Sequence, residues 1–193
     1  MSPTSSRASR HPAVVLVPYR RAFLEPFMRW RLQASTVRHN PLLALSSKEI
    51  ERRLRAESST LSDVRKHKSY RWFVEHEGTV VGNVSLKSIN HRMRFGEIGY
   101  GFGQDHHGRG LATAAVRLLV DKVFTETDLR KLLAFVHDEN HASCRVLEKL
   151  GFQREGFLRE HYLINGKPEN EVLFALLRQE WQAQHAAAHL HSA

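Results

Sequence analysis

Glu97 is the first residue whose surroundings could support chemistry, because one face of its strand is otherwise stripped of side chains. Side chains alternate between faces along a strand, so in EIGYGFG, residues 97–103, the face that carries Glu97 otherwise holds only the glycines at 99, 101 and 103. The opposite face, with Ile98, Tyr100 and Phe102, reads as ordinary core. Glycine inside a strand usually marks a bulge or the close approach of another backbone or a ligand. The pattern predicts an extended ligand beside the strand and one carboxylate, Glu97, available as a base.

The next segment, Asp105–Gly110, predicts an anion site. Gly108 and Gly110 let the backbone approach a ligand closely, and the turn runs into a helix whose first N–H groups have no partner within the helix. Such a terminus suits phosphate. A Walker loop is excluded because Gly-Lys-Ser/Thr is missing, and Thr113 stands where a dinucleotide fingerprint needs a third glycine or alanine.

Ser143 lies within the apolar stripe of a second helix, where it shares a face with Leu147 and Leu150. Its hydroxyl could bond back to a carbonyl of its own helix, or it could point at a ligand between the two helices. The residues alone leave both alternatives open.

Other reactive side chains are better explained without chemistry. His106 and His107 are adjacent, so their side chains diverge, and no third ligand is spaced to complete a metal site. The histidines at 185, 189 and 191 lie in a polar tail, and Cys144 is expected to be structural. No metal is predicted.

Periodicity and turn residues predict one domain over residues 13–181, with a loose leader over 1–12 and a loose tail over 182–193. An early hairpin followed by alternating strands and helices indicates a mixed α/β sheet with helices on its faces. The expected strands are 13–19, 71–76, 79–89, 95–103, 131–137, 152–164 and 171–181. The expected helices are 23–34, 48–56, 108–125 and 140–150, the last one capped by Asn140 and stopped by Gly151.

The chain of 193 residues carries a formal net charge of +9, and the excess lies in its first 70 residues, with 14 Lys and Arg against 5 Asp and Glu. Such a basic region could meet RNA, a ribosome or an acidic peptide, or it could simply be a solvated surface. The single cysteine fits a reducing cytoplasm, and no apolar run reaches the ~20 residues of a membrane span.

HHGRGLATAAV, then ENHASCRVLEKLGFQREG some thirty residues later, then LFALLRQEW together resemble the GCN5-related N-acetyltransferases (GNAT), most closely the RimJ/RimL-type ribosomal-protein branch. The resemblance runs from Pro18 to Trp181. It implies an α/β (α+β) fold with a mixed, mostly antiparallel sheet of six to seven strands, a splayed central strand and about four flanking helices. It also implies acetyl-CoA as co-substrate, with its pantetheine along the central strand.

The resemblance assigns site residues position by position. The implied cofactor contacts are Phe102, His107, Gly108, Arg109, Gly110, Leu111, Ala112, Asn140 and Ser143. Two positions depart from the family pattern: Asp105 replaces the usual Gln or Arg, and Leu147 stands where many relatives carry a catalytic tyrosine. The ribosomal-protein branch usually has serine at the position of Ser143.

The sequence therefore predicts an N-acetyltransferase in which an amine attacks the thioester directly, with Glu97 as base, Ser143 as acid and Tyr162 lining the amine pocket. The expected acceptor is a protein N-terminal amine, such as that of a ribosomal protein. Alternatives are a small-molecule acceptor and a non-catalytic acetyl-CoA-binding module associated with a ribosome or RNA. Ribosome association through the basic first third is expected, no membrane association, and either a monomer or a homodimer.

Overall fold

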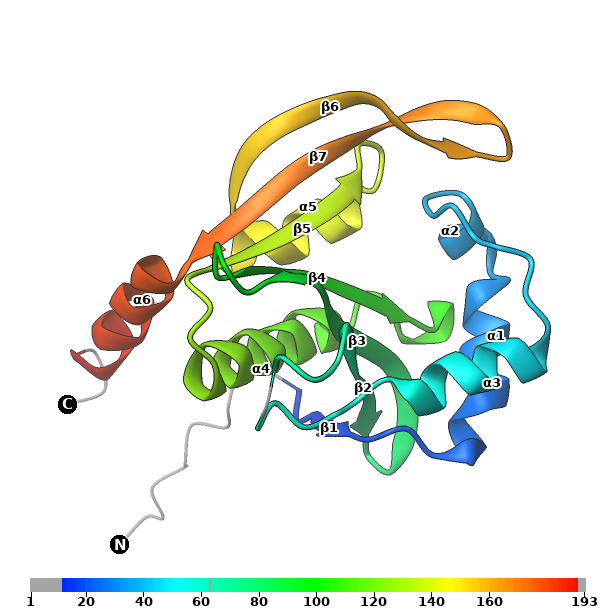
Figure 1. The fold of residues 1–193 in the computed structure, drawn as a ribbon, viewed down its shortest axis with the longest axis horizontal. Coiled ribbons are helices and arrows are strands. Elements are labelled where there is room, and N and C mark those ends of the chain that lie inside the picture. Colours follow the sequence, from blue (N-terminus) through cyan, green and yellow to red (C-terminus); the bar gives the residue numbers. More distant parts are fainter. Residues whose placement is uncertain (1–11, 63, 191–193) are drawn as a thin grey trace, which may run out of the picture.

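The computed structural model describes residues 12–62 and 64–190, so the expected leader lies, apart from Pro12, outside the described residues. A seven-stranded sheet forms its centre (Figure 1). The strands are β1 (Val15–Val17), β2 (Ser69–His76), β3 (Thr79–Asn90), β4 (Phe95–Phe102), β5 (Lys131–His137), β6 (Gln153–Ile164) and β7 (Lys167–Leu177). The helices are η1 (Arg21–Phe23), α1 (Leu24–Arg31), α2 (Ala34–Val37), α3 (Ser47–Ala56), η2 (Gln104–His106), α4 (Leu111–Glu126), α5 (His141–Lys149) and α6 (Arg178–Leu190).

The strand order is β1-β2-β3-β4-β5-β7-β6, and every neighbouring pair is antiparallel except β4 and β5. The mixed sheet and its seven strands confirm the expected fold class. The β6–β7 hairpin turns at Asn165 and Gly166, both with left-handed φ, as a two-residue hairpin turn requires. Figure 1 shows this hairpin above α5, with its turn reaching toward the side of the molecule on which α1 to α3 lie.

Two apolar clusters fix the layers of the fold. On one face of the sheet, α4 buries Val116, Leu119 and Val123 completely. On the other face, α1 and α3 pack around Phe73, which is fully buried. The sheet is thus packed on both faces, by α4 on one and by α1 and α3 on the other.

Helix ends are set by local chemistry, as the sequence indicates. Ser46 caps α3 by accepting a hydrogen bond from the N–H of Glu49, at 3.2 Å. Asn140 caps α5 in the same way, with its Oδ1 3.1 Å from the Ser143 nitrogen, and Gly151 follows the helix with φ +82°. The position of Ser143 in the first turn of α5 is therefore specified by its own sequence.

The C-terminal region differs from the expectation. Residues 178–181, predicted to continue a strand, begin α6, and residues 182–190 of the expected loose tail continue this helix. Glu180 accepts a hydrogen bond from the Leu177 nitrogen at 2.8 Å, which caps the helix start, and Trp181 donates to Asp121 at 2.7 Å. The count of about four helices was accordingly too low. Residue 191 and those after it lie outside the described part.

Among the described residues, no helix is both long and apolar enough to span a membrane.

Candidate functional site

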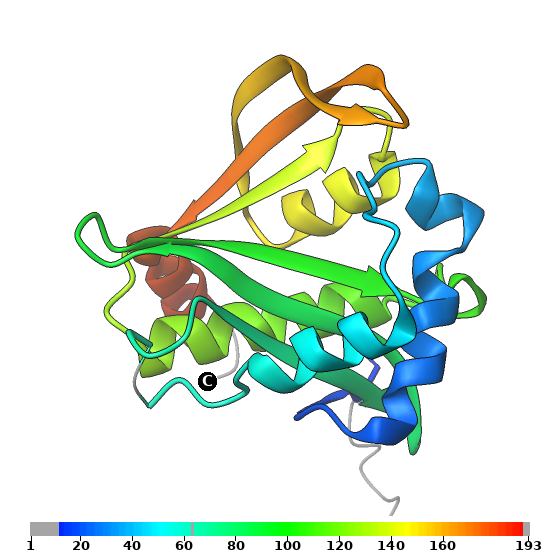
Figure 2. The same cartoon turned by 45° about the vertical axis from the view of Figure 1, so that its right-hand side comes forward.

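The central strands β4 and β5 separate soon after they begin. They pair only through residues 95–97 of β4 and 131–133 of β5, although they continue to Phe102 and His137. Figure 2 shows the two strands starting together and then diverging. From Ile98 onward, the backbone groups of β4 on this side have no β5 partner, so they are available to an extended ligand. The splay expected from the family resemblance is confirmed.

The glycine face of β4 is bare on its own strand, but its neighbour β3 supplies polar groups. Gly99 lies opposite Ser85 and Gly101 lies opposite Asn83. Each side chain donates to the carbonyl of the glycine opposite, at 3.3 Å. A Cβ at Gly101 would meet only Asn83 Nδ2, at 3.6 Å, which is ordinary contact. At Gly99 a Cβ would lie 3.1 Å from Ser85 Oγ, so this part of the face is tight. The face is therefore polar, and nothing in the sequence pattern points to these two β3 side chains.

Gly103 has a different reason to be glycine. A Cβ at this position would lie 2.6 Å from the indole nitrogen of Trp30, which α1 buries against the end of β4. The sequence analysis grouped this glycine with those that make room for a ligand, and the close approach of Trp30 corrects that interpretation.

The turn after β4 exposes a helix N-terminus. Gly108 and Gly110 both have φ +75°, and no atom lies within 4 Å of a Cβ built at Gly108. Gly110 occupies the N-cap of α4, no side chain caps the helix, and its first turn has no acidic residue. The first N–H groups of α4 and the positive end of its dipole are thus open to an anion. Arg109 and His107 are exposed beside them, and His107 Nε2 lies 3.2 Å from the Phe102 carbonyl oxygen.

Leu111 and Ala112 begin the helix that carries this terminus. Leu111 is buried and anchors the first turn in the core, whereas Ala112 is half-buried and adds little bulk. The residues assigned to the phosphate turn therefore come together, with glycine at both left-handed positions.

Asp105 is exposed in η2, just before the two glycines. A carboxylate near an anion site is repulsive, so we expect Asp105→Asn to tighten the binding of acetyl-CoA two- to fivefold, which corresponds to about 0.3–1 kcal/mol. Calorimetric titration at low and high salt measures this. The gain should shrink at high salt, and weaker binding by the variant would contradict the expectation.

Ser143 meets β4 through Tyr100. The Ser143 Oγ lies 2.6 Å from the Tyr100 hydroxyl, and the same hydroxyl donates to the carbonyl of residue 143 at 3.2 Å. Burial raises the pKa of Tyr100, so its phenol stays protonated. Ser143 thus does not bond back to its own helix, and its hydroxyl is held on the splayed strand. The side-chain oxygen of Asn140 accepts the capping hydrogen bond of α5 from the Ser143 nitrogen.

Glu97 lies on the opposite face of β4 from Tyr100 and is ion-paired, contrary to the expectation that it is unpaired. Lys87 on β3 places Nζ 2.8 Å from its Oε1, and the Ser88 hydroxyl donates to its Oε2 at 3.1 Å. The relative solvent exposure of the Glu97 side chain is 18%, so it is partly buried. Glu97 is the last residue of β4 that pairs with β5, so it stands at the point where the strands separate.

Tyr162 lies on β6, beyond the C-terminal end of β5. Its hydroxyl is buried and has no hydrogen-bond partner among the described residues. Burial, followed by the negative charges of Glu171 and Glu169, raises its pKa and keeps it protonated. Its ring lies 6.4 Å from that of His137, an almost fully buried histidine whose Nε2 is 3.5 Å from Glu169 Oε2. The sequence analysis did not single out His137, whose only signal is its position at the end of a strand.

Among the described residues, no group of three or more His, Cys, Asp and Glu is arranged to hold a metal ion. The buried Cys144 has a raised pKa, because burial disfavours its thiolate.

Comparisons with known proteins agree with this geometry. Residues 13–153 match the family model described as an acetyltransferase (GNAT) domain. The chain is 36% identical over 115 residues to the spermidine N(1)-acetyltransferase of Escherichia coli (strain K12), covering 60% of this chain and 62% of that protein. It is 35% identical over 108 residues to an uncharacterized N-acetyltransferase, p20, of Bacillus licheniformis, covering 56% and 61%. The matched segments are thus less than two thirds of the length of these relatives.

Solved structures share the fold across most of the chain. The Mycobacterium smegmatis RimJ in complex with CoA-disulfide has a TM-score of 0.77 at 25% identity, over 88% of this chain and 84% of that one. The spermidine N-acetyltransferase of Vibrio cholerae in complex with CoA and spermine has a TM-score of 0.73 at 23% identity, over 88% and 98%. The second likeness shows the fold alone. A further relative, YdaF of Bacillus subtilis (strain 168), is named as a candidate ribosomal N-acetyltransferase and is 32% identical over 109 residues, covering 56% of this chain and 60% of that protein.

Proposed function

Because the chain belongs to the family of GNAT acetyltransferase domains, we propose that it transfers the acetyl group of acetyl-CoA to a primary amine. The observation that carries the proposal is the parting of β4 from β5 next to the uncapped N-terminus of α4. One feature suits an extended, amide-containing arm and the other suits phosphate, and acetyl-CoA has both.

The residues present fit this co-substrate. Gly108 leaves open space at a left-handed position, and no acidic residue occupies the first turn of α4. The turn from His107 to Ala112 would hold the pyrophosphate, with Arg109 adding positive charge, and the free edge of β4 up to Phe102 would bond the pantetheine amides. When bound, acetyl-CoA supplies a thioester as acetyl donor and a thiolate as leaving group.

Glu97 and Ser143 stand on opposite faces of β4, which suits one to accept a proton and the other to donate one. The amine nitrogen forms a bond to the acetyl carbon as the carbon–sulfur bond breaks; Glu97, directly or through a water, takes the amine proton. Ser143 donates its hydroxyl proton to the departing sulfur. The Tyr100 hydroxyl, 2.6 Å away, can then turn its single proton from the carbonyl of residue 143 to the Ser143 oxygen, and solvent restores the phenol.

A protein N-terminal amine is the proposed acceptor because it needs little help from a base. With a pKa near 8, its deprotonation at pH 7 costs about 1 kcal/mol, whereas a lysine side chain with a pKa near 10.4 costs about 4.6 kcal/mol. Lys87 and Ser88 each contact one carboxylate oxygen of Glu97, so an acceptor that needs little help from a base suits this site. A small-molecule acceptor is the second candidate, since relatives include spermidine acetyltransferases. A purely binding role is the third.

Ribosome association through the basic first third stays a prediction. Part of that charge is paired with carboxylates elsewhere in the chain, since Arg20 pairs with Glu75 and Arg38 with Glu139. A monomer or a homodimer is compatible with the proposal.

The direct test is to incubate the protein with acetyl-CoA and three acceptor classes: peptides with a free N-terminus, the same peptides with a blocked N-terminus and an internal lysine, and spermidine. We expect release of free thiol, with the peptide gaining one acetyl group at its N-terminus. Acetyl-CoA binding without transfer to any class would favour the binding-module alternative.

We expect Glu97→Gln to lower kcat for an N-terminal acceptor about tenfold at pH 7 and less at pH 9, where more of the amine is already neutral. The matched control is Glu126→Gln, which removes another lysine-paired carboxylate, on the exposed face of α4. A pH–rate profile that is unchanged in Glu97→Gln would remove this residue from the reaction.

A further inference from the structure

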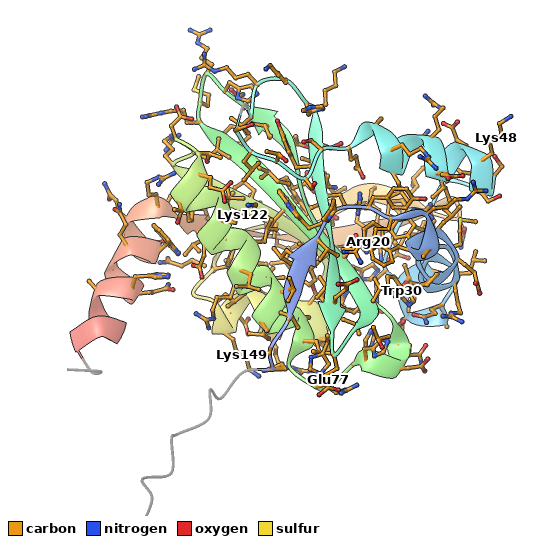
Figure 3. All side chains as sticks on the ribbon, turned by 90° about the horizontal axis from the view of Figure 1, so that it is seen from below. Arg20, Trp30, Lys48, Glu77, Lys122 and Lys149 are labelled. Carbon is orange, nitrogen blue, oxygen red and sulfur yellow. The ribbon has the colours of Figure 1, made fainter. Side chains whose placement is uncertain are left out.

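A cavity of about 250 Å³ lies between α1 and α3, below the segment that joins α2 to α3. Figure 3 labels Trp30 on α1 and Lys48 at the start of α3, the two helices that border it. Its apolar wall includes Phe27, Ile50 and Leu54, which belong to the cluster around Phe73. Nothing in the acetyl-transfer site described above uses this cavity.

Three arginines line the same cavity. Arg71 is paired with Glu57, which contributes contacts at 2.5 and 3.2 Å and is the only carboxylate of the lining. Arg53 donates a hydrogen bond to Glu49 at 3.1 Å, but Glu49 also accepts hydrogen bonds from Arg52, so its charge is shared between two arginines.

Arg31 is the third arginine, and it donates to the backbone carbonyl of Leu43 at 3.3 Å. It has no carboxylate partner in the described part of the chain. The cavity is therefore apolar on one side and carries unbalanced positive charge on the other. Burial, then the charges of Arg71 and Arg53, lowers the pKa of Arg31. An anion placed here would offset the repulsion among the arginines and supply the buried guanidinium with an opposite charge.

Arg71 lines the cavity and also lies on the face of the sheet that carries the glycines of β4. In the sheet register Arg71 lies opposite Ser85, and Ser85 lies opposite Gly99, so the three residues share one face of β2, β3 and β4. Arg71 also donates to Asn83, whose amide reaches Gly101. Two strand spacings separate the backbones of Arg71 and Gly99, about 10 Å.

An acceptor whose amine lies at the splay beside Glu97 can thus reach the cavity with about three extended residues, at ~3.3 Å each. Its backbone between the two points would face the polar side chains of Ser85 and Asn83 on β3.

Resting on the proposed transfer to a primary amine, we propose that the cavity binds a carboxylate of the acceptor. The acceptor is then a peptide N-terminus with an acidic residue at its third or fourth position, and a polyamine is disfavoured by charge. The arginines select the acceptor and take no part in the chemistry.

The acidic residues at the other end of the site do not reverse this preference. Glu139 pairs with Arg38, Glu169 with Lys167, and Glu171 with His161. Asp138 accepts a hydrogen bond from Asn170 at 3.1 Å. The cationic partners of Glu139 and Glu169 lower the negative charge that these two carboxylates present to a polycation.

The test measures binding to the full chain saturated with CoA, which cannot transfer an acetyl group. Three probes are compared by fluorescence anisotropy or calorimetry: a hexapeptide with glutamate at position four, the same peptide with glutamine there, and spermidine. We expect the glutamate peptide to bind at least tenfold more tightly than either of the others, and this preference to fall at high salt.

Arg31→Met and Arg53→Met should reduce the preference for glutamate to less than threefold while CoA affinity stays the same. The matched control is Arg55→Met. Arg55 lies on α3 like Arg53 but outside the cavity, so this variant should keep the preference for glutamate. Equal binding of the two peptides, tighter binding of spermidine, or no peptide binding at all would overturn the proposal. Failure to bind CoA would count against the proposed function instead, so the two failures are distinguishable.

Discussion

Gly108→Glu is expected to weaken acetyl-CoA binding by at least 100-fold, which corresponds to about 2.7 kcal/mol or more. The substitution puts a carboxylate beside the open N–H groups of α4, where the pyrophosphate would otherwise lie. The new side chain would fill the space in which no atom now lies within 4 Å and would repel the phosphates. Calorimetric titration with acetyl-CoA measures the effect.

The chain offers a matched control for this variant in Gly78, in the turn between β2 and β3. It has the same φ of +75° and the same empty surroundings as Gly108. Gly78→Glu therefore introduces the same charge and the same left-handed strain, about 1–2 kcal/mol, away from the site. We expect it to bind acetyl-CoA like the parent protein. Equal losses in both variants would mean that strain, and not the site, explains the result.

Ser143→Ala is expected to lower kcat about 100-fold, since removing a general acid costs between 10² and 10⁴. The fold should tolerate the change, because the buried Tyr100 hydroxyl keeps its bond to the carbonyl of residue 143. Acetyl-CoA affinity should stay within twofold. The rate of thiol release at saturating acetyl-CoA and acceptor measures kcat.

Tyr100→Phe separates the two hydroxyls of this pair. It leaves the Ser143 hydroxyl in place but removes the contact at 2.6 Å, so we expect a smaller loss, about tenfold. Thr125→Ala, which removes an exposed hydroxyl from α4, should leave the rate unchanged. A Ser143→Ala enzyme with nearly full kcat would show that the proton reaches sulfur by another route.

Local signals explain why much of the fold could be predicted from the sequence. The alternation in KLLAFVH matches β5 at both ends, and the caps at Ser46 and Asn140 set the starts of two helices. The prediction for residues 178–190 was wrong because LLRQEW continues an apolar pattern that suits either a strand or a helix. Its helix depends on Glu180 and on the contact of Trp181 with Asp121, sixty residues away.

The candidate site was predictable in its glycines and its helix N-terminus, which are local features, but not in its partners. The pairing of Glu97 with Lys87 depends on the register between β3 and β4, and the contact of Tyr100 with Ser143 depends on how α5 packs on the sheet. The arginine-lined cavity brings α1, α3 and β2 together. No residue spacing in the sequence predicts that these three elements pack around one cavity.

The most direct test of the account is calorimetric titration of the purified protein with acetyl-CoA and with desulfo-CoA. We expect binding of both in the micromolar range, about −8 kcal/mol, because in the proposed site the turn at Gly108 and the free edge of β4 would hold the phosphates and the pantetheine rather than the sulfur. Absence of binding by either compound would contradict it.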